Sequence, residues 1–292
     1  MLPVANRTEF VFNEASGHTR LDVFLAAQKN IGSREKAQAL ILAGSVSVNG
    51  RIITKAGTAL KTACAVSVKK QKQYVSRGAF KLLKALDTFK ISPAGKICVD
   101  IGSSTGGFTE VLLSKGAAHV YAIDSGTNQI DHKLRIDPRV TVFENTNARY
   151  LTSDIFSNTD EFNLFGFCAV DVSFISILKI LPACMPLLSE DSICIALLKP
   201  QFEAQRKDID KGGIVKKKEI HYALVSDLLK EIITLGLIPE QITYSPITGT
   251  KGNIEYLVLL KKRIYYFEEN GAVSDKKITS VIDDAFLELK KP

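Results

Sequence analysis

The sequence predicts an α/β protein in which helices wrap a parallel sheet, preceded by a small basic α+β module. Beyond residue 76, apolar strand-like runs alternate with helix-like segments, the pattern of a sheet covered by helices. The positive charge is confined to the start: residues 1–72 hold 11 Lys and Arg against 4 Asp and Glu, whereas residues 73–292 hold 27 of each. A basic module joined to a neutral one indicates an enzyme delivered to a polyanion, and a solvated basic surface is the alternative.

The composition narrows the class of protein further. A length of 292 residues suits about two domains. No apolar run approaches the ~18 residues of a membrane span, and the first residues lack a secretory signal. We therefore expect a cytoplasmic protein without a membrane partner. The five cysteines are odd in number and show no Cys-x-x-Cys spacing, which predicts reduced core residues and no metal site.

In the basic module, a short lead is followed by helix-like residues 20–27 and 34–43. Ser33 is placed to cap the second helix, since its hydroxyl can accept a hydrogen bond from a backbone N–H of the first turn. Asn49-Gly50 lies between two β-rich segments, and both turn positions of a tight hairpin favour positive φ. A further strand is expected at 64–68.

Three strings of this module resemble the small RNA-binding domain of ribosomal small-subunit protein four: Arg20-Leu-Asp, Ser33-Arg-Glu-Lys-Ala and Gly44-x-Val-x-Val-Asn-Gly50. The resemblance covers residues 18–70 and implies binding of structured RNA. The cations that it implies for RNA contact are Arg20, Arg34, Lys36 and Lys55. We therefore expect an RNA-binding domain at 1–68, a linker at 69–75, a larger domain at 76–262 and a C-terminal extension at 263–292.

The larger domain alternates predicted strands and helices. The expected strands are residues 96–100, 119–124, 140–144, 167–171, 193–199, 241–244 and 254–260, and the expected helices are 80–89, 109–115, 175–188 and 219–235. Residues 274–290 have the pattern of a last amphipathic helix, with simple packing or fraying as the alternative. Ligands of such sheets bind at the carboxyl ends of the strands.

A glycine-rich turn follows the first of these strands. It reads Asp100-x-Gly102-x-x-x-Gly106-Gly107, unlike the Gly-x-Gly-x-x-Gly fingerprint of dinucleotide sites. Glycines without Cβ atoms allow a close backbone approach, which suits a ligand with a ribose and an amino-acid tail but no pyrophosphate. Asp124 ends the next strand at the spacing of an acid that binds a ribose diol. An ordinary tight turn with an exposed Asp124 is the alternative.

Four ionisable residues stand out in the larger domain. Asp171 and Lys199 end nearly continuous apolar strands, and Glu255 lies early in another. A charge there must be paired or must point into the crevice at the strand ends. A structural set of ion pairs is the alternative, and Lys81, on a helix, would by itself be a solvated side chain.

Taken in order, Lys81, the glycine turn, Asp124, Asp171, Lys199 and Glu255 resemble the Lys-Asp-Lys-Glu set of FtsJ-like ribose 2′-O-methyltransferases. Longer strings resemble the TlyA family, whose members also carry a haemolysin label: Tyr74-Val-Ser-Arg-Gly78, Asp171-Val-Ser-Phe-Ile175, Lys199-Pro-Gln-Phe-Glu203, Gly212-Gly-Ile-Val215 and Gly249-x-Lys-Gly-Asn-x-Glu255. The resemblance covers residues 18–262.

The resemblance implies a Rossmann-like methyltransferase sheet, S-adenosylmethionine as cofactor, and the ribose 2′-hydroxyl of a cytidine in ribosomal RNA as substrate, in the small subunit, the large subunit or both. It places Asp124 on the cofactor ribose and Asn147 near the adenine. The residues implied at the methionine end are Asp100, Gly102, Ser103, Gly106, Gly107 and Phe108.

The chemistry of the reaction gives the four ionisable residues expected roles. A ribose hydroxyl must lose its proton as it attacks a methyl group, and a neutral lysine can take that proton. We expect Lys199 to be the base, Lys81 to be the cation that favours neutral Lys199 and steadies the oxyanion, and Asp171 with Glu255 to hold the amines. No metal is needed, because the leaving group departs as a neutral thioether.

Three other functions remain open at this point. A non-catalytic rRNA-binding assembly factor would not need Lys199 or Asp171, a membrane-lytic protein would need an amphipathic basic helix, and a pseudouridine synthase would leave the glycine turn unexplained. Two departures from the family pattern also matter. Lys72-Gln-Tyr-Val75 stands where many members have Arg-x-Trp-Val, which puts family-like coupling of RNA and cofactor binding in doubt, and family behaviour is not assumed at Phe80.

Overall fold

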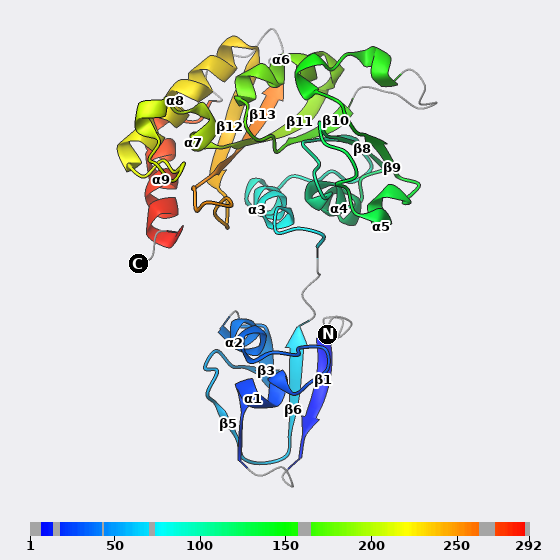
Figure 1. Ribbon diagram of the computed structural model, residues 1–292, viewed down its shortest axis with the longest axis vertical. Helices are drawn as coiled ribbons and strands as arrows, with labels where there is room; N and C mark the ends of the chain where they lie inside the picture. Colours follow the sequence, from blue (N-terminus) through cyan, green and yellow to red (C-terminus); the bar gives the residue numbers. More distant parts are fainter. Residues whose placement is uncertain are drawn as a thin grey trace. The chain divides into compact units, whose positions relative to one another are not determined.

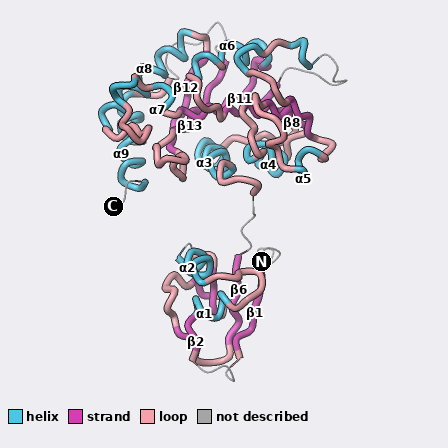
Figure 2. Tube along the Cα trace, in the orientation of Figure 1, coloured by secondary structure: helices cyan, strands magenta, loops and turns pink. Residues whose placement is uncertain are grey.

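The computed structural model describes residues 7–13, 18–42, 44–69, 74–156, 165–262 and 272–289. The chain divides into two compact units, Met1–Gln73 and Tyr74–Pro292. Figure 1 gives the course of the chain and Figure 2 its secondary structure. Most of the expected linker and the departure at Lys72-Gln73 lie outside the described residues.

The first unit is a small α+β fold. Its elements are β1 (Arg7–Phe12), β2 (Thr19–Arg20), α1 (Leu21–Ala26), α2 (Arg34–Leu42), β3 (Val46–Val48), β4 (Arg51–Ile52), β5 (Ala59–Leu60) and β6 (Cys64–Lys69). Four strands form an antiparallel sheet in the order β1-β6-β3-β4, and β2 pairs with β5. Strand β1 forms where the sequence indicated only a short lead. Local sequence did not predict it, because the strand is held by pairing with β6, more than fifty residues further along the chain.

Local signals in this unit have the expected effect. Asn49 and Gly50 have φ of 47° and 81°, which confirms the tight hairpin between β3 and β4. The Ser33 hydroxyl accepts a hydrogen bond from the backbone N–H of Lys36 at 3.2 Å, which confirms the helix cap. Leu21, Leu25 and Ile41 are fully buried in the core that joins both helices to the sheet.

The second unit is an α/β sandwich around a seven-stranded sheet. Its strands are β7 (Ile97–Ile101), β8 (His119–Ile123), β9 (Val140–Phe143), β10 (Phe165–Val170), β11 (Leu188–Leu198), β12 (Leu237–Tyr244) and β13 (Tyr256–Lys262). Their order is β12-β13-β11-β10-β7-β8-β9. The strands from β7 to β11 run parallel, whereas β13 is antiparallel to both β11 and β12.

Helices cover both faces of this sheet, as Figure 1 shows. The main helices are α3 (Ala79–Phe89), α4 (Gly107–Ser114), α5 (His132–Arg135), α6 (Leu181–Cys184), α7 (Pro200–Glu203), α8 (Lys218–Thr234) and α9 (Asp275–Leu289). Alternate strand residues point to opposite faces. Val99 and Tyr121 therefore pack in one apolar core with α6, α8 and α9, while Cys98 and Val120 pack in another with α3 and α4.

Two segments of the larger unit differ from expectation. Residues 175–188 form three short helical pieces, Ile177–Lys179, α6 and Met185–Leu187, because Pro182 and Pro186 cannot donate the backbone hydrogen bonds of one continuous helix. The last helix does form as α9, and Ile278, Val281 and Ile282 are buried in the core shared with α8 and β12.

Candidate active site

Strand direction brings the four ionisable residues to one edge of the sheet. Asp171 follows β10 and Lys199 follows β11, whereas Glu255 immediately precedes β13. Because β13 is antiparallel to β11, its beginning lies beside the end of β11. Lys81 comes from α3, which packs under the same part of the sheet. Four residues spread over 175 positions of the sequence thus converge on one site.

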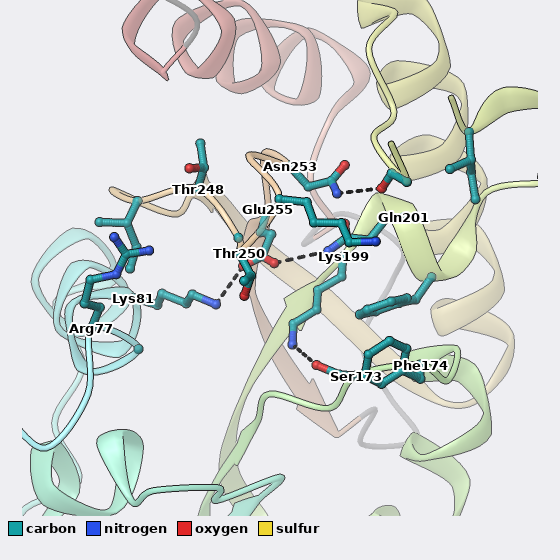
Figure 3. A pocket seen from close by; sticks show the side chains of 17 residues that line it. Arg77, Lys81, Ser173, Phe174, Lys199, Gln201, Thr248, Thr250, Asn253 and Glu255 are labelled. Atoms are coloured by element: carbon teal, nitrogen blue, oxygen red, sulfur yellow. Dashed lines mark hydrogen bonds and ion pairs between the residues drawn. The ribbon is translucent and has the colours of Figure 1, made fainter. Parts of the chain in front are cut away.

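The four side chains form a continuous ion-pair array. Figure 3 shows three of them, Lys81, Lys199 and Glu255. Lys199 Nζ lies 2.5 Å from Asp171 Oδ1, and Lys81 Nζ lies 2.7 Å from Glu255 Oε2. Lys81 Nζ is also 3.7 Å from Asp171 Oδ2. Asp171 therefore faces both amines through different oxygens, and it links the two lysines.

Burial makes these pairings strong. The side chains of Lys81 and Lys199 are 10% and 8% exposed, and that of Glu255 is 3% exposed. Burial disfavours the charged form of Lys81, but the carboxylates of Asp171 and Glu255 outweigh it, so the pKa of Lys81 is raised. Lys81 is accordingly a permanent cation at neutral pH.

Two polar neighbours orient the array. Lys199 Nζ donates a hydrogen bond to Ser173 Oγ at 2.8 Å, and Gln201 Nε2 donates one to Glu255 Oε1 at 3.3 Å. Sequence reasoning assigned no role to Ser173 or Gln201, although both lie within the strings that carry the family resemblance. Their position two residues beyond Asp171 and Lys199 is the signal that could have found them.

A cavity of about 590 Å³ opens over the two lysines and Glu255. Arg77, Phe202 and Thr250 are among the other residues that line it. The lining of the cavity thus combines the charged groups of the array with an arginine and an aromatic ring. Such a lining suits a nucleotide, which carries a phosphate, a ribose and a flat base.

The loop after β10 separates this cavity from a second one of about 360 Å³. Ser173 and Phe174 line both cavities. Phe174 is 91% exposed, and its ring lies 5.0 Å from that of Phe202. Its φ of 64° is the left-handed region that disfavours a bulky residue. An exposed aromatic ring held in a strained backbone is typical of a residue kept for function.

The second cavity contains part of the predicted cofactor set. Gly102, Asp124 and Asn147 line it, together with Asp171 and Ser104, a residue that the sequence analysis did not single out. Asp124 Oδ2 accepts a hydrogen bond from the backbone N–H of Ser104 at 2.8 Å, and Oδ1 accepts one from that of Gly126 at 2.7 Å. These bonds fix the carboxylate at the carboxyl end of β8.

The other candidates lie behind or beside the wall of that cavity. Asp100 and Ser103 are buried, and Phe108 packs in the core with α3. Asp100 Oδ2 accepts a 2.6 Å hydrogen bond from Thr109 Oγ1, whereas Oδ1 is buried without a hydrogen-bond partner in the described part of the chain. Burial, reinforced by nearby Asp171, raises the pKa of Asp100 to about 7.

The glycines of the turn are required by the chain's own packing. A Cβ on Gly102, whose φ is 83°, would lie 2.5 Å from the carbonyl oxygen of Asp171. Cβ atoms on Gly106 and Gly107 would lie 2.2 Å from side-chain atoms of Leu134 and Ser76. Gly102 thus allows the turn after β7 to lie against the start of the loop after β10, a steric reason different from the close ligand approach inferred from sequence.

The residues present fit S-adenosylmethionine. Asp124 offers carboxylate oxygens to a ribose diol, and Ile123, Ala148 and Ile180 offer an apolar wall to an adenine ring. Asp171 borders this cavity and contacts both lysines. The cavity therefore offers both the polar and the apolar groups that the cofactor needs.

The four predicted RNA-contacting cations all belong to the first unit. Arg20 and Arg34 contact the buried carboxylate of Asp22 at 3.0 and 3.1 Å, and each side chain remains about half exposed. Lys36 and Lys55 are exposed and lie outside this cluster. The structure thus brings two of the four cations together.

The residues that the structure describes contain neither a candidate metal cluster nor a helix suited to span a membrane. Among those described residues, no group of three or more His, Cys, Asp or Glu residues is arranged to hold a metal ion. Within the same residues, none of the helices combines the length and apolar character needed to cross a bilayer.

Comparison with known proteins gives consistent matches. Residues 74–262 match the FtsJ-like methyltransferase family, and residues 19–63 match the S4 domain. A putative rRNA methyltransferase of Bacillus subtilis, YqxC, is 42% identical over 93% of this chain and 95% of its own. The 16S/23S rRNA (cytidine-2′-O)-methyltransferase TlyA of Mycobacterium tuberculosis is 38% identical over 92% of this chain and 97% of its own. A solved structure of a putative hemolysin from Streptococcus thermophilus has a TM-score of 0.70 and 38% identity, covering 94% of this chain and 98% of that one.

The fold, the two cavities and these matches define an S-adenosylmethionine-dependent methyltransferase of the FtsJ-like class with an N-terminal S4 domain. Within that class, the chain belongs to the TlyA family.

Proposed function

We propose that the protein transfers a methyl group to the ribose 2′-hydroxyl of a cytidine in ribosomal RNA, in the small subunit, the large subunit or both. The family supplies the reaction class, and the name of the Mycobacterium tuberculosis relative supplies the cytidine. A ribosomal substrate places the enzyme in the cytoplasm. The basic first unit supports the proposal, because positive charge favours binding to the phosphate backbone.

The observation that carries the proposal is the position of the ion-pair array between the two cavities. Asp171 lines the smaller cavity, while Lys81, Lys199 and Glu255 line the larger one. A hydroxyl group in the larger cavity would approach a methyl group presented from the smaller cavity beside Lys199. Holding two reactants in this way supplies much of the rate of a group transfer.

S-adenosylmethionine supplies an electrophilic methyl group on a positively charged sulfur. A ribose hydroxyl that accepts this methyl group must lose its proton, and Lys199 Nζ would take that proton while the cofactor leaves as a neutral thioether. Asp171 and Ser173 hold Lys199 Nζ in place at 2.5 and 2.8 Å. After transfer, the Lys199 ammonium returns the proton to solvent.

Lys81 and Glu255 act beside this base. Lys81 stays charged because Glu255 and Asp171 raise its pKa, and its positive charge stabilises the negative charge that develops on the attacking oxygen. Glu255 holds that ammonium at 2.7 Å and is itself held by Gln201. Together they keep the cation in one place while the proton moves at Lys199.

The exposed ring of Phe174 completes the proposed substrate site. It lies at the boundary of both cavities and contacts Phe202. A nucleobase taken out of its stack gains about 1–3 kcal/mol on an aromatic platform. We assign Phe174 to the base of the target nucleotide, which would orient the attached ribose toward Lys199.

The test is transfer of labelled methyl from S-adenosylmethionine to separated small and large ribosomal subunits. Recovery of 2′-O-methylcytidine from the digested RNA, and its loss in Lys199→Ala, is the expected result. Methylation of one subunit alone would define the substrate.

The alternative function is a non-catalytic assembly factor, and the same assay separates it from the enzyme. Cofactor and RNA binding without methyl transfer to either subunit would overturn the proposal. The paired lysines argue against this alternative, because an assembly factor gains nothing from two buried amines beside a cofactor cavity.

A further inference from the structure

A buried carboxylate lies beneath two of the exposed arginines of the S4 domain. The Asp22 side chain is fully buried at the start of α1. Its Oδ1 accepts hydrogen bonds from Arg20 Nε and the backbone N–H of Val23, both at 3.0 Å. Its Oδ2 accepts bonds from Arg20 Nη2 at 3.0 Å, Arg34 Nε at 3.1 Å and Gln38 Nε2 at 2.9 Å. The Arg20 hydrogen bond leads the causes that hold the pKa of Asp22 well below its usual range.

These contacts leave most of the arginine donors unused by Asp22. A guanidinium has five N–H groups. Arg20 directs its Nε and one Nη2 proton to Asp22, and Arg34 directs only its Nε. The two side chains are 52% and 53% exposed, so their outer donors reach solvent. One buried carboxylate therefore fixes two planar groups whose remaining donors face outward.

A turn of backbone further restricts Arg20. The backbone N–H groups of Leu21 and Asp22 donate to the carbonyl oxygens of Thr58 and Ala56 at 2.8 and 3.1 Å. A Cβ on Gly57, between them, would lie 3.1–3.2 Å from atoms of the Arg20 guanidinium. The missing Cβ of Gly57 thus leaves space for the Arg20 guanidinium beside the turn.

We propose that Asp22 is the positioning residue of a phosphate site formed by Arg20 and Arg34, which together bind one phosphodiester group of the RNA backbone. Guanidinium groups bind phosphate oxygens through parallel N–H bonds, and a fixed orientation reduces the entropy lost on binding. This inference rests on the proposed RNA-binding function. Lys36 and Lys55, exposed and outside the cluster, add charge but no fixed geometry.

A positioning role for Asp22 and simple electrostatics predict opposite changes in RNA affinity when its charge is removed. Asp22→Asn removes a negative charge from the domain, so charge alone predicts tighter RNA binding. If Asp22 positions the two guanidiniums, the same substitution weakens binding. Glu9→Gln is the matched control, because it removes one exposed acid of the same unit outside the cluster.

The experiment measures the affinity of the full-length chain for an rRNA transcript at several salt concentrations. We expect Asp22→Asn to bind about tenfold more weakly, with a salt slope reduced by about 0.7–0.9 for the lost phosphate contact. Glu9→Gln should bind as tightly as the unaltered chain or more tightly. Gly57→Ala, which crowds Arg20 without a change of charge, should bind about threefold more weakly.

Thermal unfolding of each variant separates positioning from folding. If Asp22→Asn does not fold, Gly57→Ala decides the question. Folded variants at Asp22 or Gly57 that bind with unchanged or higher affinity and an unchanged salt slope would overturn the inference while leaving the proposed function intact. Failure of the unaltered chain to bind RNA would overturn the proposed function and this inference with it.

Discussion

Lys199 and Asp171 form a 2.5 Å ion pair although their side chains line different cavities. Asp171 borders the cavity that fits the cofactor, and Lys199 borders the one assigned to the nucleotide. The pair therefore crosses the boundary at which the proposed methyl transfer would take place. A movement of either residue changes the base and the cofactor wall together.

If Lys199 is the base, its substitution should slow methyl transfer without weakening the binding of the cofactor. We expect Lys199→Met to lower kcat by roughly 10²–10⁴-fold, because positioned proton transfer contributes about that much. S-adenosylmethionine binding, measured by calorimetry, should change less than about threefold, since Lys199 lies in the other cavity. Lys199→Arg is the charge-matched control. Retention of normal kcat by either variant would remove Lys199 from the role of base.

The Lys81–Glu255 pair predicts strongly non-additive effects on stability. Breaking a buried pair leaves one charge without its partner, at a cost of about 3–5 kcal/mol in the free energy of unfolding. We expect Lys81→Met and Glu255→Gln each to be destabilising, and the double variant to be destabilised by less than the sum of the two. Urea denaturation measures all three, and simple additivity would show that the two residues are not coupled.

Burial of Asp100 predicts a pH-dependent stability. Its folded pKa of about 7 lies above its usual value, so its contribution to stability is full at low pH and is lost as pH rises from about 4 to 7. Asp100→Asn, which stays neutral, should equal the unaltered chain near pH 4 and exceed it by roughly 2–4 kcal/mol above pH 7.5. Chemical denaturation across this pH range measures the difference.

Asp87→Asn is the control for this prediction, because Asp87 is an exposed acid on α3. A stability gain for Asp100→Asn that did not grow with pH would show that Asp100 is ionised throughout. Since Asp100 is also a candidate for the cofactor's methionine end, we expect the same variant to bind S-adenosylmethionine more weakly.

Sequence periodicity predicted most of the larger domain, because long alternating strands and helices are formed by local patterns. All seven of its strands form within a few residues of their predicted positions, apart from the earlier starts of β11 and β12. The meeting of Asp171 and Lys199 follows from their places at the ends of two strands expected to be parallel. What the sequence could not give was strand direction: β13 is antiparallel, and this alone brings Glu255 to Lys81.

Local sequence patterns also could not predict the contacts that small or polar side chains make between segments. The hydrogen bond from Arg34 to Asp22 joins residues twelve positions apart, and no spacing rule predicts it. The pattern predicts space for a ligand at Gly102, which lines the smaller cavity, but it does not predict that the missing Cβ also makes room for the Asp171 carbonyl. Such features depend on the packed structure of several segments at once.

Phe174 predicts opposite changes in stability and activity. Its φ of 64° costs about 1–2 kcal/mol for a residue with a Cβ, and its ring is 91% exposed, so the fold gains little from it. Phe174→Gly should therefore raise the free energy of unfolding by about 1 kcal/mol. The same change removes the platform assigned to the nucleobase, and we expect KM for ribosomal RNA to rise by about tenfold.

Phe174→Ala separates the two effects, since it removes the ring but keeps the Cβ. It should match Phe174→Gly in the loss of RNA affinity while gaining little or no stability. S-adenosylmethionine affinity serves as the internal control and should change little, because Phe174 is one residue at the margin of that cavity. If both variants methylated RNA with an unchanged KM, the strained ring would have no part in binding the substrate, and the exposed contact with Phe202 would be left to explain its conformation.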